Sequence, residues 1–173
     1  MALNCKISHG IAPICETKVS GIKKLWVANW DESHTFTSSD DCEVDTIDMG
    51  TEKFYALAIE DQTGYFTADL TVGSSNDSKA INHTVGFNIN HISCDFMSDW
   101  KNFLLGTVIF AVLDNNRNVW IVGADNGVTS TTFNYASGTA NGDASGVNAV
   151  FEGLQPNFLL KVKDVALIKA LEA

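Results

Sequence analysis

The stretch NVWIVGADNGVTSTTFNYASGTANGDASGVNAVFEG, residues 118–153, decides the fold that the sequence predicts. Its β-branched and aromatic residues suit pleated strands. Strands are predicted at 119–122, at 128–135 and in a third segment with Val147, Ala149 and Phe151 on one face. Asn126 and Gly127 tolerate positive φ, so residues 124–127 predict a two-residue hairpin turn between the first two strands. The small residues at 138–146 link the second strand to the third. We therefore expect a β scaffold without a catalytic pocket.

Composition limits the classes of protein to consider. The chain has 173 residues, 45% of them hydrophobic, which predicts one domain with a buried hydrophobic core. It carries 11 basic and 21 acidic residues, a net charge of −10. This charge disfavours binding in a DNA groove or on an anionic membrane surface.

The four cysteines, Cys5, Cys15, Cys42 and Cys94, show no C-x-x-C spacing, which excludes zinc-ribbon and thioredoxin motifs. The first residues have no apolar run after a basic one, so we expect no secretory signal and intracellular synthesis. Reduced thiols are then the simplest expectation, although Cys5 and Cys15 are close enough in sequence to pair.

The remaining segments complete the prediction of a mainly β protein. Strands are expected at 22–30, 52–60, 65–72, 80–93 and 107–113, a short amphipathic helix at 95–105, and a short helix or fraying strand near the C-terminus. In the first strand, Leu25 and Val27 share one face and Trp26 the other. The strand at 52–60 is apolar on both faces, which predicts a central strand paired in a hairpin with 65–72. The fold class is an antiparallel β-sandwich or partly closed barrel with one short helix, a single domain over 1–173.

Residues 31–50 are polar and acidic, and they predict a projecting arm. The acidic cluster is Asp40, Asp41, Glu43 and Asp45. A solvated tip explains it most simply, and a contact with a basic partner is the alternative.

The long strand at 80–93 has two different faces. Asn82, Thr84, Asn88 and Asn90 alternate with apolar residues, so this amide-rich face is predicted to line a shared surface or a lumen. His83 and His91 fall on the apolar side, where a hydrogen-bonded histidine is more common than a metal ligand.

The sequence contains no motif for catalysis or cofactor binding. Residues 114–118 begin like a calcium loop, but Val119 occupies the position that requires Gly, and no Glu stands at position twelve. Phosphate-binding, zinc-protease and nucleophile-elbow motifs are missing as well. We predict a protein that is not an enzyme and has no cofactor or metal.

The chain is similar to the tail tube proteins of tailed bacteriophages, particularly the small β-rich tube and ring components of phages of Bacteroidetes, including crAss-like phages. The segments that carry this resemblance are VWIVGADNG at 119–127, SGTA at 137–140, Gly142-Asp143 with Gly146, and the opening in which Cys5 and Cys15 precede Gly21-Ile22-Lys23.

The resemblance implies a virion protein, assembled in the host cytoplasm, whose copies close into a ring in the tail, usually a hexamer. Its partners would be further copies and the adjacent tail or connector rings. The 80–93 strand would form the wall between subunits, and the 31–50 arm would reach the next ring. DNA would pass without specific binding, for which a negative charge is suitable, and no membrane would be involved.

Three alternatives stay open. A carbohydrate-binding β-sandwich would use Trp26, Trp30, Trp100 and Trp120. A capsid decoration protein is a variant of the virion hypothesis with another partner. A hydrolase whose site has no recognisable motif is the third.

Overall fold

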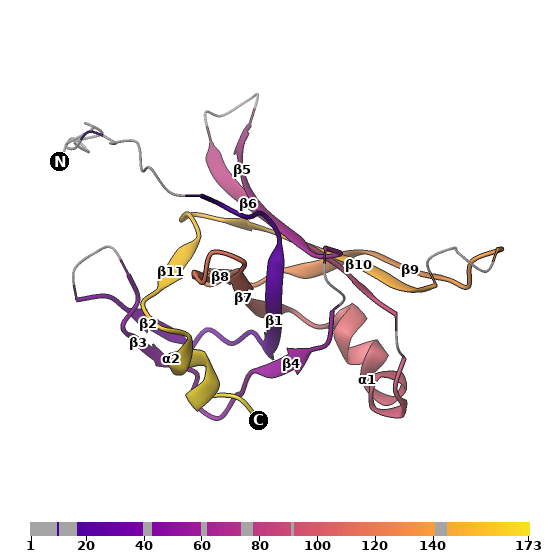
Figure 1. Ribbon diagram of the computed structural model, residues 1–173. Helices are drawn as coiled ribbons and strands as arrows, with labels where there is room; N and C mark the ends of the chain where they lie inside the picture. The colour runs from indigo at the N-terminus through magenta and orange to yellow at the C-terminus, as the bar shows by residue number, and fades with distance from the viewer. Residues whose placement is uncertain are drawn as a thin grey trace.

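The computed structural model describes residues 10, 17–39, 43–59, 62–73, 78–90, 92–140 and 145–173. Its main elements are two antiparallel sheets that stack as a sandwich and do not close into a barrel (Figure 1). A small two-stranded sheet and two helices pack around them, and the second helix lies near the C-terminus, where the sequence predicts a short helix or a fraying strand. The predicted mainly β fold class is confirmed.

The first sheet, which we call the buried sheet, has the strand order β11-β8-β7-β1-β4. Its strands are β11 (Leu160–Val162), β8 (Val119–Val122), β7 (Val108–Asp114), β1 (Ile22–Asn29) and β4 (Tyr55–Leu57). The alternation predicted for β1 is confirmed, because Leu25 and Val27 face the sandwich core while Trp26 packs on the opposite face. That opposite face is covered by the hairpin of β2 (Thr35–Thr37) and β3 (Thr46–Asp48) and by α2 (Val165–Ala170).

The second sheet, which we call the open sheet, has the strand order β5-β6-β10-β9. Its strands are β5 (Tyr65–Val72), β6 (Lys79–Ile89), β10 (Gly146–Gln155) and β9 (Thr129–Ala136). Phe87 and Phe151 stack on its inner face, and Phe110 of the buried sheet meets both rings at centroid distances of 5.9 and 5.1 Å. One face of the open sheet therefore closes the core, while its other face is turned away from it.

The predicted helix is present as α1 (Cys94–Leu105), and it packs at one end of the sandwich beneath β9 and β10 (Figure 1). The Ser93 hydroxyl accepts a hydrogen bond from the N–H of Phe96 and so caps the first turn. On the sheet side, Phe96 stacks on Phe133 and Phe103 lies edge-on to Phe151.

The predicted hairpin between 119–122 and 128–135 is wrong. β8 belongs to the buried sheet and β9 to the open sheet, and β9 instead pairs with β10 across the Gly-rich link. The connection is a wider turn, closed by a hydrogen bond from the N–H of Gly127 to the carbonyl of Gly123, and both glycines have positive φ. This turn carries the chain from one layer to the other.

The predicted central strand at 52–60 is also wrong. Only Tyr55–Leu57 form a strand, β4, which lies at the edge of the buried sheet and does not pair with β5. Phe54 is fully buried in the hydrophobic cluster next to Trp26, and its backbone hydrogen-bonds Leu171 and Ala173 near the C-terminus, whereas Tyr55 is 54% exposed.

Residues 31–50 cover the buried sheet over most of their described length, in place of the projecting arm that the sequence predicts. Val44 and Met49 are buried, and Phe36 and Ile47 pack against the same cluster. Residues 40–42 lie outside the described part of the chain. No helix among the described residues is both long enough and apolar enough to cross a bilayer.

Candidate assembly surface

The outer face of the open sheet is a polar surface with an ordered arrangement. The pairing of the strands places Asn88, Asn148 and Asn134 directly opposite one another in one row. A second row consists of Thr67, Thr84 and Glu152, and Gly86 of β6 lies between the two rows. Asp69, Glu152 and Lys79 are the only charged residues of the four strands. This face therefore carries amides, hydroxyl groups and the carboxylates of Asp69 and Glu152, together with the exposed side chains of Tyr65 and Leu154, while Lys79 pairs with Val72 on the core side.

Between these two rows, Tyr65 lies across Gly86, its direct partner on β6. A Cβ atom at Gly86 would come within 2.3 Å of the Tyr65 ring, so the absence of a side chain there lets the ring lie on the sheet. The side chain of Tyr65 remains half exposed on the outer face.

The structure brings only part of the predicted interface set together. Asn82, Thr84 and Asn88 occupy the outer face of β6, and Asn90 is exposed just beyond its end. Glu43 and Asp45 lie elsewhere, beside the buried sheet, where Glu43 pairs with Lys161 at 2.5 Å and Asp45 accepts a hydrogen bond from Ser39. Asp40, Asp41, Cys5, Cys15, Cys42 and His91 lie outside the described residues. Of the predicted acidic cluster, the described residues Glu43 and Asp45 therefore lie on a different surface from the amide face.

Both edges of the open sheet are open. β5 and β9 are each eight residues long, and among the described residues no backbone hydrogen bond joins the outer edge of either strand to another segment. Proteins usually protect such edges with lysine, proline or inward-pointing charges. β5 and β9 contain no lysine and no proline, and Asp69 is their only charged residue. These edges are long, unprotected and suited to pairing with another strand.

The edges of the buried sheet are covered by contrast. Val44 adds a parallel bridge to Val162 at the β11 edge, with hydrogen bonds of 2.7 and 2.9 Å. Phe54 adds another to Glu172 next to the β4 edge. Both bridges join residues that are more than a hundred positions apart.

Two buried polar side chains, which the sequence analysis did not identify as a pair, fix the crossing between the sheets. The Gln155 amide accepts hydrogen bonds from the N–H groups of Asp125 and Asn126 and donates one to the carbonyl of Gly127. The Nδ1 atom of His83 accepts a hydrogen bond from the N–H of Gly123 at 3.2 Å. These contacts define the turn at 123–127 and thus the position of β9.

His83 is the hydrogen-bonded core histidine that its place in the alternation predicts. Its ring is 1% exposed, and Nε2 lies 3.2 Å from the carbonyl oxygen of Asn157, so the neutral ring with the proton on Nε2 satisfies both partners. Burial lowers the pKa of His83, and the Asn157 carbonyl and the nearby Asp125 charge oppose this only in part.

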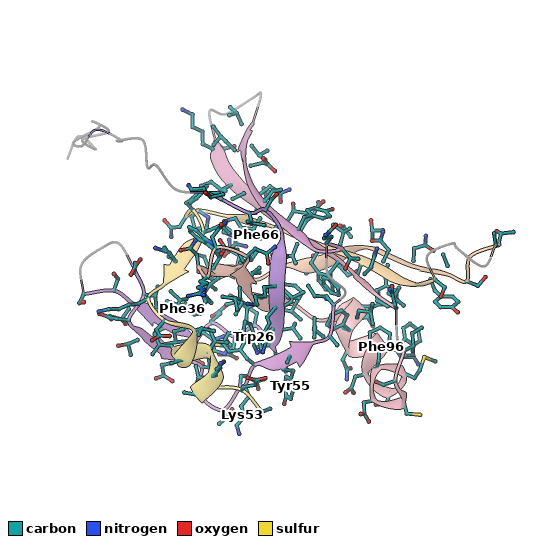
Figure 2. The ribbon with its side chains drawn as sticks, viewed as in Figure 1. Trp26, Phe36, Lys53, Tyr55, Phe66 and Phe96 are labelled. Atoms are coloured by element: carbon teal, nitrogen blue, oxygen red, sulfur yellow. The ribbon has the colours of Figure 1, made fainter. Side chains whose placement is uncertain are left out.

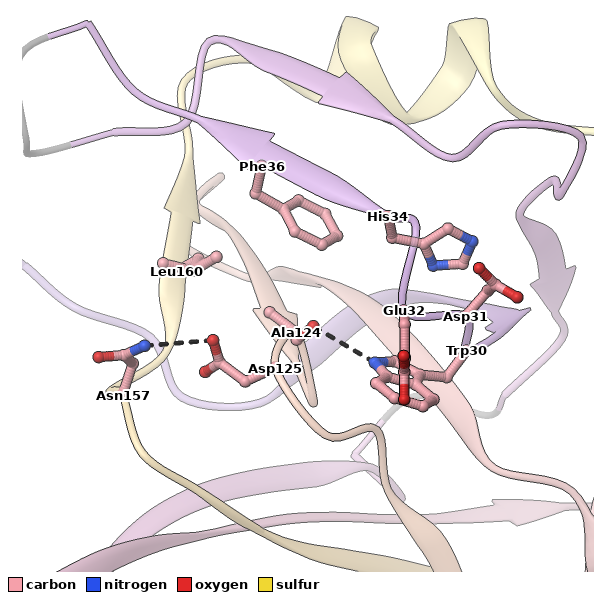
Figure 3. A pocket seen from close by; sticks show the side chains of 9 residues that line it. All are labelled: Trp30, Asp31, Glu32, His34, Phe36, Ala124, Asp125, Asn157 and Leu160. Carbon is pink, nitrogen blue, oxygen red and sulfur yellow. Dashed lines mark hydrogen bonds between the residues drawn. The ribbon is translucent and has the colours of Figure 1, made fainter.

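A cavity of about 340 Å³ lies between the β2 segment and the 123–127 turn (Figure 3). The Trp30 indole donates a hydrogen bond to the Ala124 carbonyl, and Asn157 donates one to Asp125. Asp31, also in the lining, has its pKa lowered by hydrogen bonds from the Ser33 hydroxyl and backbone N–H. Among the described residues no group of three or more His, Cys, Asp or Glu side chains is arranged to hold a metal ion.

No protein-family model matches the chain, and no curated protein matches it in sequence.

Proposed function

We propose that the protein is a structural subunit that self-assembles into rings through the two edges of the open sheet, as a component of a phage tail tube or head-to-tail barrel. The observation that carries this proposal is the pair of equally long, unprotected edges on one sheet. A contact between two different surfaces of identical copies is heterologous, and such contacts produce closed rings when the rotation between copies closes.

Strand direction supports this pairing. All neighbours in the open sheet are antiparallel, so β5 and β9, at its two edges, run in opposite directions. When β9 of one copy lies beside β5 of a rotated copy, the new ladder is antiparallel like the others. Because each copy contributes four strands, an even number, neighbouring strands stay antiparallel where one copy meets the next.

The alternation of core-side and outer residues in β5 and β9 favours one register for this ladder. If Tyr65 faces Ala136 of the neighbouring copy, the core-side and outer faces of the two strands match along β9 as far back as Thr132, where the register of β9 shifts. Phe66 then faces Tyr135, and both side chains lie on the core side of their sheets. A slip by one residue would place apolar residues opposite the polar face.

The chemistry of the outer face is suited to a channel for DNA. Threonines, asparagines and two acidic residues, Asp69 and Glu152, line most of it, and Lys79, the only lysine or arginine of the four strands, pairs with Val72 on the core side. Phosphate binding requires lysine or arginine to replace counterions, so a wall of this kind would let DNA slide without holding it.

The carbohydrate-binding alternative receives less support. Trp26 is 1% exposed and cannot stack on a sugar. The other three tryptophans are separated: Trp30 lines the cavity of Figure 3, Trp100 lies on α1, and Trp120 lies beside Phe66.

The proposal is tested by light scattering on the purified protein, with negative-stain microscopy of the same peak. Closed rings or stacked tubes of uniform diameter are expected. A strict monomer across the full concentration range would contradict self-assembly, and binding of that monomer to polysaccharide would favour the carbohydrate-binding alternative.

A further inference from the structure

An apolar groove of about 400 Å³ runs between α1 and the core-side face of β9. α1 contributes Phe96, Met97 and Trp100, and β9 contributes Phe133 and Tyr135. The rings of Phe96 and Phe133, which line the groove from α1 and from β9, stack on each other at a centroid distance of 6.2 Å. Met97 and Tyr135 are 59% and 60% exposed, so the groove is open along its rim.

This groove borders the open β9 edge. Phe133 and Tyr135 lie on the edge strand itself, and within the described part of the chain no further strand follows β9 in the sheet. A strand added to the β9 edge would therefore extend the β9 side of the groove and place its own core-side residues next to α1. A strand that pairs with the β9 edge would therefore also contact the groove.

The opposite edge of the same sheet carries a matching apolar row. Phe66, Ala68, Leu70 and Val72 alternate along the core side of β5, in unbroken register with β6. Leu70 and Val72 are 65% and 55% exposed, because the β5–β6 ribbon extends past the sandwich (Figure 1). Figure 2 shows Phe66 of β5 and Phe96 of α1 far apart along the sheet, so one copy cannot bring its own row to its own groove.

The register with Tyr65 opposite Ala136 brings the two surfaces together across two copies. Phe66 of the incoming strand faces Tyr135, and Ala68 faces Phe133. Leu70 is then a diagonal neighbour of Phe133, a separation of about 7–8 Å that long side chains bridge. Continuity with the edge and matching apolar rows on the same side favour a second copy of this chain as the occupant.

We propose that the groove between α1 and β9 is the docking site for the core-side apolar row of β5 from a second copy, so that α1 clamps the neighbour's edge strand. This inference rests on the proposed ring and adds a specificity element to it. The backbone ladder alone would accept any strand, whereas the groove selects one whose apolar residues fall on the core side.

The test uses one charge on each surface. Met97→Glu places a carboxylate in the groove, and Leu70→Glu places one on the apolar row. Asn102→Glu on α1 and Thr71→Glu on the outer face of β5 are matched controls at exposed positions outside the two surfaces. We expect Met97→Glu and Leu70→Glu to raise the concentration for half-assembly by about tenfold or more, and both controls to assemble as the wild type does. Unchanged melting temperatures at high dilution show that the variants fold.

A mixture of the two defective variants tests whether the groove of one copy binds the apolar row of another. The Leu70→Glu chain keeps an intact groove and the Met97→Glu chain keeps an intact row, so an equimolar mixture should form a 1:1 heterodimer that cannot extend. No heterodimer, or a groove-to-groove homodimer of the Leu70→Glu variant, would overturn the inference. Wild-type rings with Met97→Glu and Leu70→Glu indistinguishable from the controls would overturn it while leaving the proposed function in place. A monomeric wild type would contradict both.

Discussion

The two sheets use their surfaces in opposite ways. The buried sheet is covered on both faces, by the open sheet on one side and by α2 and the β2–β3 hairpin on the other, and both its edges carry bridges from distant residues. The open sheet contributes one face to the core and leaves the other face and two edges exposed. Under the proposed function, this difference separates two tasks: the covered buried sheet stabilises the subunit, and the exposed face and edges of the open sheet contact other copies.

The largest effect is expected in the core that joins the two sheets. Phe110→Ala removes a fully buried ring that contacts Phe87 and Phe151, and it should lower the free energy of unfolding by about 3–5 kcal/mol. The matched change Tyr135→Ala, at the exposed end of β9, should cost only about 0.5 kcal/mol in the monomer. Denaturant unfolding at high dilution measures both. Equal losses would contradict the division of tasks between the sheets.

The next effect concerns the turn that carries the chain from one sheet to the other. Gln155→Leu leaves the N–H groups of Asp125 and Asn126 and the Gly127 carbonyl without this partner, which should cost about 1–3 kcal/mol. The control, Asn157→Ala, removes only an exposed hydrogen bond to Asp125. Unfolding and amide exchange at 125–127 measure the change. Unaltered protection of these amides would mean that Gln155 does not hold the turn.

A smaller effect is expected on the outer face of the open sheet. Gly86→Ala places a methyl group against the Tyr65 ring, and rotating the ring away should cost about 0.5–1.5 kcal/mol. In a Tyr65→Ser background the same change should cost less, so a double-mutant cycle isolates the contact. Equal costs in the two backgrounds would show that the ring does not lie over Gly86.

The smallest effect is a dependence on pH at His83. Because burial lowers the pKa of His83 in the folded state, the unfolded chain binds the extra proton more readily. This contribution to stability is complete above the unfolded pKa of about 6.5, and it is lost as the pH falls from that value towards the folded pKa. Melting temperatures of wild type and His83→Gln between pH 7.5 and 5.5 test it. The wild type should lose more than the variant, and parallel curves would contradict the assignment.

The sequence alone predicted the faces of single elements well. The alternation in β1 separated Leu25 and Val27 from Trp26, and helical spacing located α1. These features depend on local periodicity, which each segment carries in itself.

Strand pairing could not be predicted in the same way. Residues 124–127 have the composition of a hairpin turn, but Gln155, 28 to 30 residues further on, fixes them in a crossing between sheets. Residues 52–60 are apolar on both faces, which predicts a central strand, yet the backbone of Phe54 pairs with the C-terminal residues 171–173. For the candidate surface, the amide side of β6 was predictable, whereas the open edges and the groove arise only from tertiary pairing.

The most direct test of the central claim is disulfide trapping between the two open edges, with Tyr65→Cys and Ala136→Cys in a background whose four native cysteines are replaced by serine. Directly opposite residues in an antiparallel pair have Cβ atoms about 4.5–5.5 Å apart, which is close to disulfide geometry. The account predicts that the double variant forms an oxidation ladder ending in one closed-ring band, while each single variant stays uncrosslinked. Dimers from either single variant, or no ladder from a double variant that assembles normally, would contradict edge-to-edge pairing of β5 with β9.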